Sequence, residues 1–373
     1  MTISKLLVSF FRNIQDAEVL FSPQANVILG DNGQGKTNLL EAIHVLSLTK
    51  SFRTHQARDL INWKASKYHI KGEIQNKEGK FLLSVEYSHL IRRILVNDSK
   101  ANLIRYLGLL TVAVFSTIHV EQFKSDAEIR RRTVDRGLYP IHPTHLRRIL
   151  DYGRLIKQKN SLLREGSSGY NKRNRDLLES WNLQIADLGA RIIKSRQRYI
   201  EKIKDKLNIQ QNWFTPESLT VKYLPSFELN TDLTLEETHD QMLKKLSQES
   251  QNEFRARRSL VGPHLDQILL LVNGKSMQRF GSAGQQRSSL LAYQLAQMEI
   301  HFDVRGEYPI FLMDDVDAEL DEGRMNSILK VLESKTQVFI TTNKPDFIKK
   351  KRFGDSLVKT FEVKQGQIKE ITF

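Results

Sequence analysis

The hydrophobic positions near the N-terminus occur in short apolar runs separated by turn-forming residues, which is the pattern of β-strands. From Lys36 the pattern changes, because Leu39, Leu40, Ile43 and Leu46 recur at the spacing of a helix with a buried face. The strands predicted in this part of the chain are residues 5–11, 17–21, 26–30, 68–74, 81–87, 91–96 and 109–115.

From about Glu121 to Ser250 the apolar positions follow a helical period, and this region is predicted to consist mostly of long helices. Pro140 and Pro143 mark a break near its start. The Gly-, Ser- and Asn-rich segment 166–174 is predicted to be a loop between helices, and 218–223 a strand.

Alternating strands and helices return towards the C-terminus. The predicted strands are 268–272, 309–313, 338–341, 357–363 and 368–373, and the predicted helices are 283–301 and 319–332. The pattern therefore predicts an α/β fold interrupted by a mainly helical insertion.

Composition narrows the class of partner. The 373 residues suffice for two domains, and the net charge of +14 favours a polyanion as partner. Nucleic acid is preferred to an anionic membrane, because no helix combines a basic face with an aromatic apolar face; a merely well-solvated basic surface remains an alternative. The absence of cysteine excludes disulfides and cysteine-ligated metals. With no secretory signal and no apolar run of about 20 residues, we expect a cytoplasmic protein that does not span a membrane.

A phosphate-binding loop follows the strand predicted at 26–30. The segment GDNGQGKT has the spacing G-x-x-x-x-G-K-T between a strand and a helix, as the motif requires. Its glycines let backbone N–H groups face a phosphate, the lysine reaches the β- and γ-phosphates, and the threonine hydroxyl holds Mg²⁺. The residues predicted to bind nucleotide here are Gly30, Asp31, Asn32, Gly33, Gln34, Gly35, Lys36, Thr37 and Asn38.

Two acidic residues end the apolar strand at 309–313. Acids at the carboxyl edge of a parallel sheet face a nucleotide bound there. Asp314 is predicted to complete the coordination of Mg²⁺, and Asp315 to orient or deprotonate the attacking water; Lys36 and Asp315 are thus the predicted catalytic residues.

A third motif, GSAGQQR, opens the helix predicted to begin at 283. Ser282 and the helix N-terminus can donate to a phosphate, and the small residues allow close approach. The motif is similar to the signature sequence of ABC-type ATPases, which contacts the γ-phosphate held by the opposite subunit. The resemblance implies that Ser282, Gly284 and Gln285 bind nucleotide in trans.

Together these motifs resemble the RecF family, and the resemblance runs along nearly the whole chain. The matching segments are Phe11-Arg12-Asn13, GDNGQGKTNLLEAI, Ser51-Phe52-Arg53-Thr54, Arg130-Arg131-Arg132 with Asp135, Gln158-Lys159-Asn160 with Leu162-Leu163, Gly262-Pro263-His264, Gly284-Gln285-Gln286-Arg287, and Asp314-Asp315 with Glu319-Leu320-Asp321.

The resemblance implies an ABC-type, SMC-like ATPase head, predicted at 1–115 and 260–373, with a helical arm at 116–259. It also implies weak, DNA-stimulated hydrolysis of ATP with Mg²⁺, an ATP-dependent homodimer, and sequence-independent binding of gapped and junction DNA. The implied role is in recombinational repair and replication restart, where RecO and RecR are partners in loading RecA.

The chain departs from the family in two places. Residues 117–120 read Thr-Ile-His-Val after Phe115-Ser116, where the family has Pro-Glu-Asp-Leu, and 265–267 read Leu-Asp-Gln in place of Arg-Asp-Asp. Contacts from the arm to nucleotide or to the partner subunit are expected to differ there. After the strand at 338–341, where many ABC ATPases have a switch histidine, the chain reads Thr341-Thr342-Asn343.

Several basic residues have two open interpretations. Arg12 and Arg53 either contact the nucleotide or form surface ion pairs, and His264 either faces the nucleotide or is a core histidine. The runs Arg130–Arg132 and Arg191, Lys194, Arg198 and Lys202 either contact DNA phosphates or form solvated helix faces.

Three alternative functions share part of this pattern. An SMC-like ATPase of another DNA-processing or phage-defence system would use the same head. An ABC transporter ATPase is disfavoured, because Gly281–Arg287 lacks the double glycine of the transporter signature. A DNA-binding protein without ATPase activity is disfavoured by the complete set Lys36, Thr37, Asp314 and Asp315.

Overall fold

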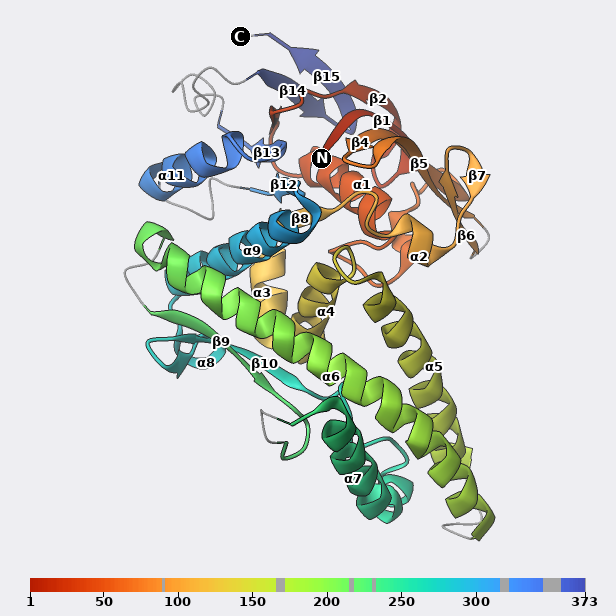
Figure 1. Ribbon diagram of the computed structural model, residues 1–373. Helices are drawn as coiled ribbons and strands as arrows, with labels where there is room; N and C mark the ends of the chain where they lie inside the picture. Colours follow the sequence, from red (N-terminus) through yellow and green to blue (C-terminus); the bar gives the residue numbers. More distant parts are fainter. Residues whose placement is uncertain are drawn as a thin grey trace. The chain divides into compact units, whose positions relative to one another are not determined.

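The computed structural model describes residues 1–88, 91–165, 172–214, 218–229, 233–315, 322–344 and 357–372. The chain forms two compact units, one of residues 1–122 with 283–373 and one of residues 123–282 (Figure 1). We call them the head unit and the helical unit.

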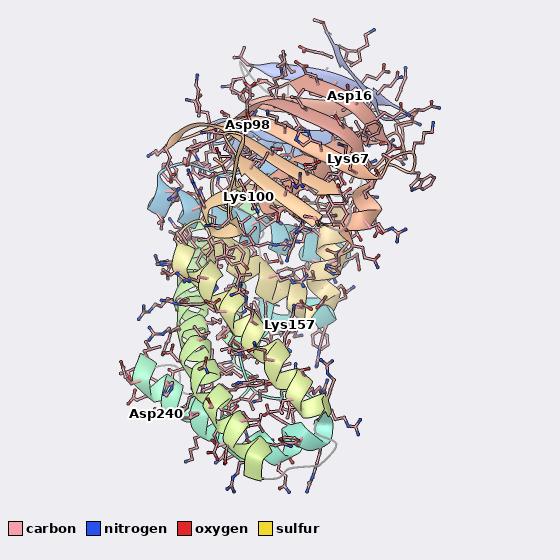
Figure 2. The ribbon with its side chains drawn as sticks, turned by 90° about the vertical axis from the view of Figure 1, so that its right-hand side faces the viewer. Asp16, Lys67, Asp98, Lys100, Lys157 and Asp240 are labelled. Atoms are coloured by element: carbon pink, nitrogen blue, oxygen red, sulfur yellow. The ribbon has the colours of Figure 1, made fainter. Side chains whose placement is uncertain are left out.

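The head unit contains an antiparallel sheet of strand order β2-β1-β4-β5-β6-β7. Alternation of apolar and polar residues directs one face inward, with Leu6, Val8 and Ile70 buried, while Lys67 and Lys100 are exposed (Figure 2). The strands are β1 (Thr2–Phe11), β2 (Ile14–Leu20), β4 (Lys67–Asn76), β5 (Gly79–Ser88), β6 (Ile91–Val96) and β7 (Ser99–Lys100).

A second sheet of the head unit has the order β15-β14-β3-β13-β12-β8. All its pairs are parallel except β14 with β15. The three central strands are buried along their whole length, as expected where both faces of a parallel sheet are covered. The strands are β3 (Ala25–Leu29), β8 (Val112–Phe115), β12 (Ile310–Met313), β13 (Val338–Thr342), β14 (Val358–Lys364) and β15 (Gln367–Ile371).

Helix α1 (Lys36–Leu48) contacts β1, β4 and β5 of the first sheet and β8 and β13 of the second. It is buried on nearly every side, which explains why its apolar residues are not confined to one stripe. The other helical segments of the head unit are η1 (Ala57–Leu60), α2 (Leu103–Tyr106), α9 (Ala283–Arg305) and α11 (Glu322–Glu333); α3 (Thr117–Ser125) crosses the limit between the units.

The helical unit is built on the long helices α5 (Pro143–Glu165) and α6 (Lys172–Phe214), which run side by side (Figure 1). Helix α7 (Leu235–Ala256) begins with a capping box formed by Thr234 and Glu237. The remaining elements are α4 (Ala127–Leu138), α8 (Met277–Phe280) and the small sheet of β9 (Leu219–Leu224), β10 (Gln267–Val272) and β11 (Lys275–Ser276).

The limits of the two units lie later in the chain than the predicted 115/116 and 259/260. The second difference has a clear cause. β10 pairs along its length with β9, so the strand that the sequence pattern assigned to the head belongs to the compact helical unit. The predicted loop 166–174 lies partly outside the described residues, and its last three residues are already in α6.

A buried ionic network joins segments of the helical unit that are far apart in sequence. Arg196 on α6 donates to both carboxylate oxygens of Asp135 at 2.9 and 2.8 Å, and lies 3.6 Å from the carboxylate of Asp266. Burial alone would raise the pKa of Asp135, but Arg196 and a hydrogen bond from His145 outweigh it and lower the pKa to about 2. Asp135 therefore stabilises the fold while ionised, and this contribution is lost as the pH falls towards its folded pKa.

The side chains of the arginine run 130–132 contact other residues of the same chain. Arg130 is buried and donates to the carbonyls of Phe123 and Lys124, and Arg131 donates to the carbonyl of Asp266 at 2.8 Å. Arg132 pairs with Glu128. Arg130 and Arg131 therefore support the helical unit, and contact of this run with DNA stays a prediction.

Replacing Arg196→Met should destabilise the protein by about 3–5 kcal/mol, because it leaves Asp135 and Asp266 as buried charges without their cation. Arg198→Met, at an exposed position of the same helix, is the matched control and should change stability by less than about 0.5 kcal/mol. Urea denaturation followed by circular dichroism measures both. Equal stability of the two variants would contradict the role of this network.

No helix in the described parts of the chain combines the length and apolarity required to cross a bilayer.

Candidate nucleotide-binding site

The predicted phosphate loop leaves the carboxyl end of β3 and leads into α1. Two of its glycines are needed for close packing: a Cβ added to Gly35 would lie 2.6 Å from Asn13 Oδ1, and one added to Gly30 would lie 2.5 Å from the carbonyl oxygen of Val363. Gly35 also has a φ of 117°, which side chains disfavour. The loop is thus held close to two other segments of the head unit.

Asn13 and the β14–β15 turn fix the conformation of the loop. Asn13 Nδ2 donates to the carbonyl of Gln34 at 2.8 Å, and Asn13 Oδ1 accepts from Asn38 Nδ2 at 2.8 Å. From the other side, the backbone N–H groups of Gly366 and Gln365 donate to the carbonyl and to the side-chain oxygen of Gln34, at 2.9 and 2.7 Å. The loop is therefore preorganised by contacts distant in sequence.

Lys36 is buried, and its Nζ donates to the carbonyls of Gly30 at 2.8 Å and Asp31 at 3.2 Å. Phosphate oxygens are stronger acceptors than these carbonyls, because both partners would then be charged. The loop also ends at the N-terminus of a helix thirteen residues long, where the backbone dipole favours an anion.

The threonine and carboxylate predicted to hold Mg²⁺ are in direct contact. Thr37 Oγ1 lies 2.9 and 3.0 Å from the two carboxylate oxygens of Asp314, although 277 positions separate them in sequence. Thr341 Oγ1 donates to Asp314 as well, at 2.7 Å. The strand order β3-β13-β12 explains the meeting, because these parallel strands end at the same edge of the sheet.

Burial raises the pKa of Asp314, and the neighbouring Asp315 raises it further, against hydrogen bonds from Thr341 and Thr37 that lower it. A divalent cation would reverse this balance by favouring the ionised carboxylate. Among the described residues no three His, Asp or Glu side chains gather as metal ligands. One carboxylate and one hydroxyl suit Mg²⁺ that takes its remaining ligands from phosphates and water.

Asp315 follows at the tip of β12, with a φ of 49°, a conformation that aspartate adopts more readily than most residues. Its backbone N–H donates to Thr341 Oγ1 at 2.8 Å, and its side chain is half-buried. Thr341 thus contacts both acidic residues, and it ends the predicted strand after which many ABC ATPases have a switch histidine. Glu319-Leu320-Asp321 lies outside the described residues.

Arg12 and Arg53 converge on Glu41 of α1, a residue to which the sequence pattern assigned no role. Arg12 donates from Nε and Nη2 to the two carboxylate oxygens of Glu41, both at 2.9 Å, and Glu41 is fully buried. Arg53 donates to Asn38 Oδ1 at 2.8 Å and lies 3.5 Å from Glu41. Both arginines therefore form ion pairs with Glu41, and their contact with nucleotide stays a prediction.

The signature residues differ from the phosphate loop in being exposed. Ser282 and Gly284 are exposed and Gln285 is half-buried, at the start of α9. A Cβ added to Gly284 would have no atom within 4 Å, so packing within the chain does not require glycine there. Phe280, just before the motif, is 71% exposed.

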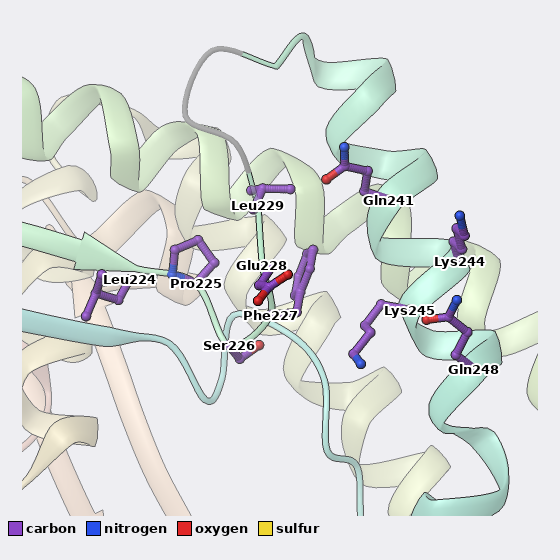
Figure 3. Close-up of a pocket in the computed structure, with 10 residues that line it drawn as sticks. All are labelled: Leu224, Pro225, Ser226, Phe227, Glu228, Leu229, Gln241, Lys244, Lys245 and Gln248. Atoms are coloured by element: carbon purple, nitrogen blue, oxygen red, sulfur yellow. The ribbon is translucent and has the colours of Figure 1, made fainter.

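A groove of about 1050 Å³ lies in the helical unit, between the segment that follows β9 and one face of α7 (Figure 3). Leu224, Pro225 and Phe227 line one side, and Lys244 and Lys245 the other. None of the predicted nucleotide-binding residues lines it.

Both places where the sequence departs from the RecF pattern contain a buried side chain with a partner. Ser116 Oγ accepts from the backbone N–H of His119 at the start of α3, and Asp266 is buried beside Arg196. Leu265, at the position of the family's arginine, is 38% exposed. His264 is half-buried and hydrogen-bonded to the hydroxyl of Tyr152 at 2.7 Å, and its partial burial lowers its pKa to about 4, which fits a neutral histidine engaged within the helical unit.

A phosphate loop after a buried parallel strand, an acidic strand end beside it and a signature helix define an ABC-type P-loop ATPase head. The profile of the family described as RecF/RecN/SMC N terminal domain matches residues 2–369. The chain belongs to this family and, within it, to the RecF proteins.

The similarity extends over the full length. The DNA replication and repair protein RecF of Enterococcus faecalis is 33% identical over 374 residues, covering 99% of this chain and 98% of the relative. That of Limosilactobacillus reuteri is 34% identical over 371 residues, with the same coverage. These relatives confirm the predicted resemblance.

Solved structures agree with the fold. A structure of the recombination mediator protein RecF with ATP, in the RecFOR pathway, superposes with a TM-score of 0.90 at 28% identity, covering 99% of this chain and 97% of that one. A crystal structure of an Smc head bound to the winged-helix domain of ScpA has a TM-score of 0.53 at 15% identity, covering 100% and 98%, and supports the fold alone. The predicted α/β, ABC-type head is confirmed.

Proposed function

We propose that this protein is an ATP-dependent, DNA-binding ATPase of recombinational repair and replication restart. It binds gapped or junction DNA as an ATP-induced homodimer and assists RecA loading together with RecO and RecR. The observation that carries the ATPase part is the contact between Thr37 and both oxygens of Asp314. It supports a preformed Mg²⁺–nucleotide position at the end of the phosphate loop.

In this proposal the residues of the head unit have separate roles. Backbone N–H groups of 30–38 and the Lys36 ammonium bind the phosphates, while Thr37 and Asp314 hold Mg²⁺. When bound, Mg²⁺ neutralises charge on the β- and γ-phosphate oxygens. Asp315 orients the attacking water or accepts its proton, since it lies next to the metal-binding carboxylate at the same strand end.

The proposed dimer explains the exposure of the signature residues. Ser282 and Gly284 are exposed, and the glycine is not required by neighbours in its own chain. A small residue at an exposed helix N-terminus allows another molecule's phosphate to approach the backbone closely. We therefore assign Ser282, Gly284 and Gln285 to the nucleotide held by the second subunit.

DNA is the polyanion that the net charge of +14 favours. On the helical unit, Arg198 and Lys202 of α6 are exposed. The pKa of His142 is lowered by burial and then by Lys202, His145, Arg148 and Arg198, so positive charge concentrates around it. By contrast Arg191 pairs with Asp187. These observations support assigning DNA contacts first to Arg198 and Lys202 of the predicted stripe.

The alternative proposal is an SMC-like ATPase of another DNA-processing or phage-defence system. Its head would hydrolyse ATP in the same way, so ATPase measurements alone do not separate the two. Stimulation of RecA filament growth on gapped DNA by this protein with RecO and RecR does. Absence of stimulation, with ATP-dependent DNA binding intact, would favour the alternative.

Lys36→Ala should abolish ATP binding, because the β- and γ-phosphates lose their main cationic side-chain contact. The matched control is Lys100→Ala, which removes an exposed lysine of the head unit. Isothermal titration with ATP measures both affinities. Near wild-type affinity in Lys36→Ala would refute the phosphate-loop assignment.

Affinity for DNA should fall steeply with salt and vary little with sequence, at a slope of about 0.9 per duplex phosphate neutralised. Reversing Arg198 and Lys202 to Glu should reduce that slope by about 1–2. The same reversal at Arg154 and Lys157 of α5 is the control with equal charge change (Figure 2 labels Lys157). An equal effect of the two pairs, measured by fluorescence anisotropy, would show that only total charge matters.

A further inference from the structure

Trp63 of the head unit is completely exposed, with a relative accessibility of 103%. It lies between η1 and β4, in a part of the head to which the proposed ATPase mechanism gives no role. Burial of a large aromatic side chain contributes strongly to the free energy of folding, and Trp63 makes no such contribution because it is exposed. An indole held in water is available for a ligand with a flat apolar face.

The turn that carries Trp63 is firmly built. Asn62 is buried; its backbone N–H donates to the carbonyl of Phe10 at 2.8 Å, and its side-chain nitrogen donates to the carbonyl of Arg12 at 2.6 Å. Its side-chain oxygen accepts from the backbone N–H of Lys64 at 3.0 Å, and its carbonyl accepts from Ala65 at 2.9 Å. The exposed indole is thus attached to a preorganised turn.

A second aromatic side chain is exposed on the adjoining segment. Phe10, which lies opposite Asn62, is 42% exposed and has a φ of 53°. A bulky residue in the left-handed region is strained, and such strain is concentrated at functional sites. The backbone therefore retains an unfavourable conformation at a partly exposed aromatic residue whose carbonyl is hydrogen-bonded to the Trp63 turn.

The surface around Trp63 is basic. Three basic residues close to Trp63 in sequence, Arg58, Lys64 and Lys67, are exposed. Figure 2 shows Lys67 at the start of its strand in the antiparallel sheet. The acidic residue nearest to Trp63 in sequence is Asp59. Its carboxylate accepts a hydrogen bond from Thr54 Oγ1 at 2.6 Å, and its backbone carbonyl accepts one from Arg12. We call Phe10, Arg58, Trp63, Lys64 and Lys67 the Trp63 patch.

We propose that the Trp63 patch binds single-stranded DNA, with an unpaired base stacked on the indole and the neighbouring phosphates contacted by Lys64, Lys67 and Arg58. Exposed aromatic rings interleaved with lysine and arginine are what sequence-tolerant binding of single strands requires. Bases inside a duplex are already stacked and offer no free face, so the patch distinguishes unpaired from paired DNA. This inference rests on the proposed DNA binding and gives it a contact for the single-stranded side of a gap or junction.

The decisive comparison is Trp63→Leu with Trp63→Tyr. Leucine keeps an apolar side chain but has no ring to stack, whereas tyrosine keeps a stacking face. Anisotropy with labelled oligothymidylate and with a blunt duplex of equal length, both in saturating ATP, gives the affinities. We expect Trp63→Leu to weaken oligothymidylate binding roughly 5- to 100-fold, Trp63→Tyr to restore most of the loss, and duplex binding to stay unchanged.

A second pair of variants tests the phosphate contacts. Lys64→Gln with Lys67→Gln should reduce the salt dependence of oligothymidylate binding by about 0.7 for each phosphate that is no longer neutralised. ATP affinity, measured in parallel, should equal that of the wild type in every variant of the patch.

Four outcomes would overturn the inference. These are an unchanged oligothymidylate affinity of Trp63→Leu, equal losses on single strand and duplex, equal losses in Trp63→Leu and Trp63→Tyr, and a loss of ATP affinity, which would make the indole a contact of the nucleotide base. Failure of the proposed function is distinguishable, because the wild-type protein would then bind neither DNA with ATP present.

Discussion

Asp315→Asn should bind ATP normally and hydrolyse it roughly 10²- to 10⁴-fold more slowly, which is the usual contribution of a general base. The amide still donates to and accepts from a water molecule, but it cannot take the proton. The surrounding structure should persist, because the contact that Asp315 makes with Thr341 comes from the backbone N–H and not from the carboxylate. The ATP-bound dimer should therefore accumulate.

Single-turnover hydrolysis and size-exclusion chromatography in ATP measure the two effects together. Asp205→Asn, at an exposed position of α6, is the matched control and should hydrolyse ATP at the wild-type rate. Unchanged turnover of Asp315→Asn would assign the base to another residue, with Asp314 and Glu319 as the first candidates. Loss of ATP binding would instead show that the carboxylate of Asp315 is needed to build the site.

The parts of the site that the sequence predicts are those whose chemistry is local. The loop at 30–37 is recognised because its glycines, lysine and threonine are neighbours in the chain, and the acidic pair because it directly follows an apolar strand. Contacts between residues on different strands cannot be predicted from neighbouring residues in the sequence. Thr341 between the two acids, and Asn13 on the phosphate loop, depend on the order in which strands pair.

Arg130–Arg132 shows that a run of like charges in the sequence does not give the surroundings of its members. Three consecutive residues of a helix point in directions about 100° apart, so they cannot all face one ligand. In the structure Arg130 is buried, Arg131 donates to the carbonyl of Asp266, and Arg132 pairs with Glu128. Helical spacing therefore predicts three different surroundings for the three arginines, as the structure has them. The sequence pattern does not predict the buried ion pair between Arg196 and Asp135, because these two residues are 61 positions apart.

The domain limits illustrate a further gap between pattern and fold. The strand predicted at 268–272 looks like a return to the alternating α/β region, and periodicity does not tell which sheet the strand joins. Pairing with β9 assigns it to the helical unit, so the compact head unit resumes only at Ala283, where the signature helix begins. Long-range strand pairing is a property of the whole chain.

Mixing two inactive variants, Lys36→Ala and Ser282→Arg, should restore part of the ATPase activity. If the proposed active site is shared between two chains, Lys36 of one subunit and Ser282 of the other serve the same nucleotide. Ser282→Arg should leave ATP binding to the monomer intact and block dimerisation, because it places bulk and charge at an exposed position where the chains are proposed to meet. ADP should not support the dimer, since it lacks the γ-phosphate that reaches across.

In the mixed dimer one composite site carries both defects and the other carries neither, because it pairs the intact Lys36 of one chain with the intact Ser282 of the other. Activity is measured by phosphate release while the ratio of the two variants is varied, and should be greatest near equal amounts. Mixing Lys36→Ala with Asp315→Asn is the control: both residues belong to the same half of the site, so every mixed dimer keeps one defect in each site and should stay inactive. Full activity of Ser282→Arg alone, or a wild-type protein that remains monomeric in saturating ATP and DNA, would contradict the shared site.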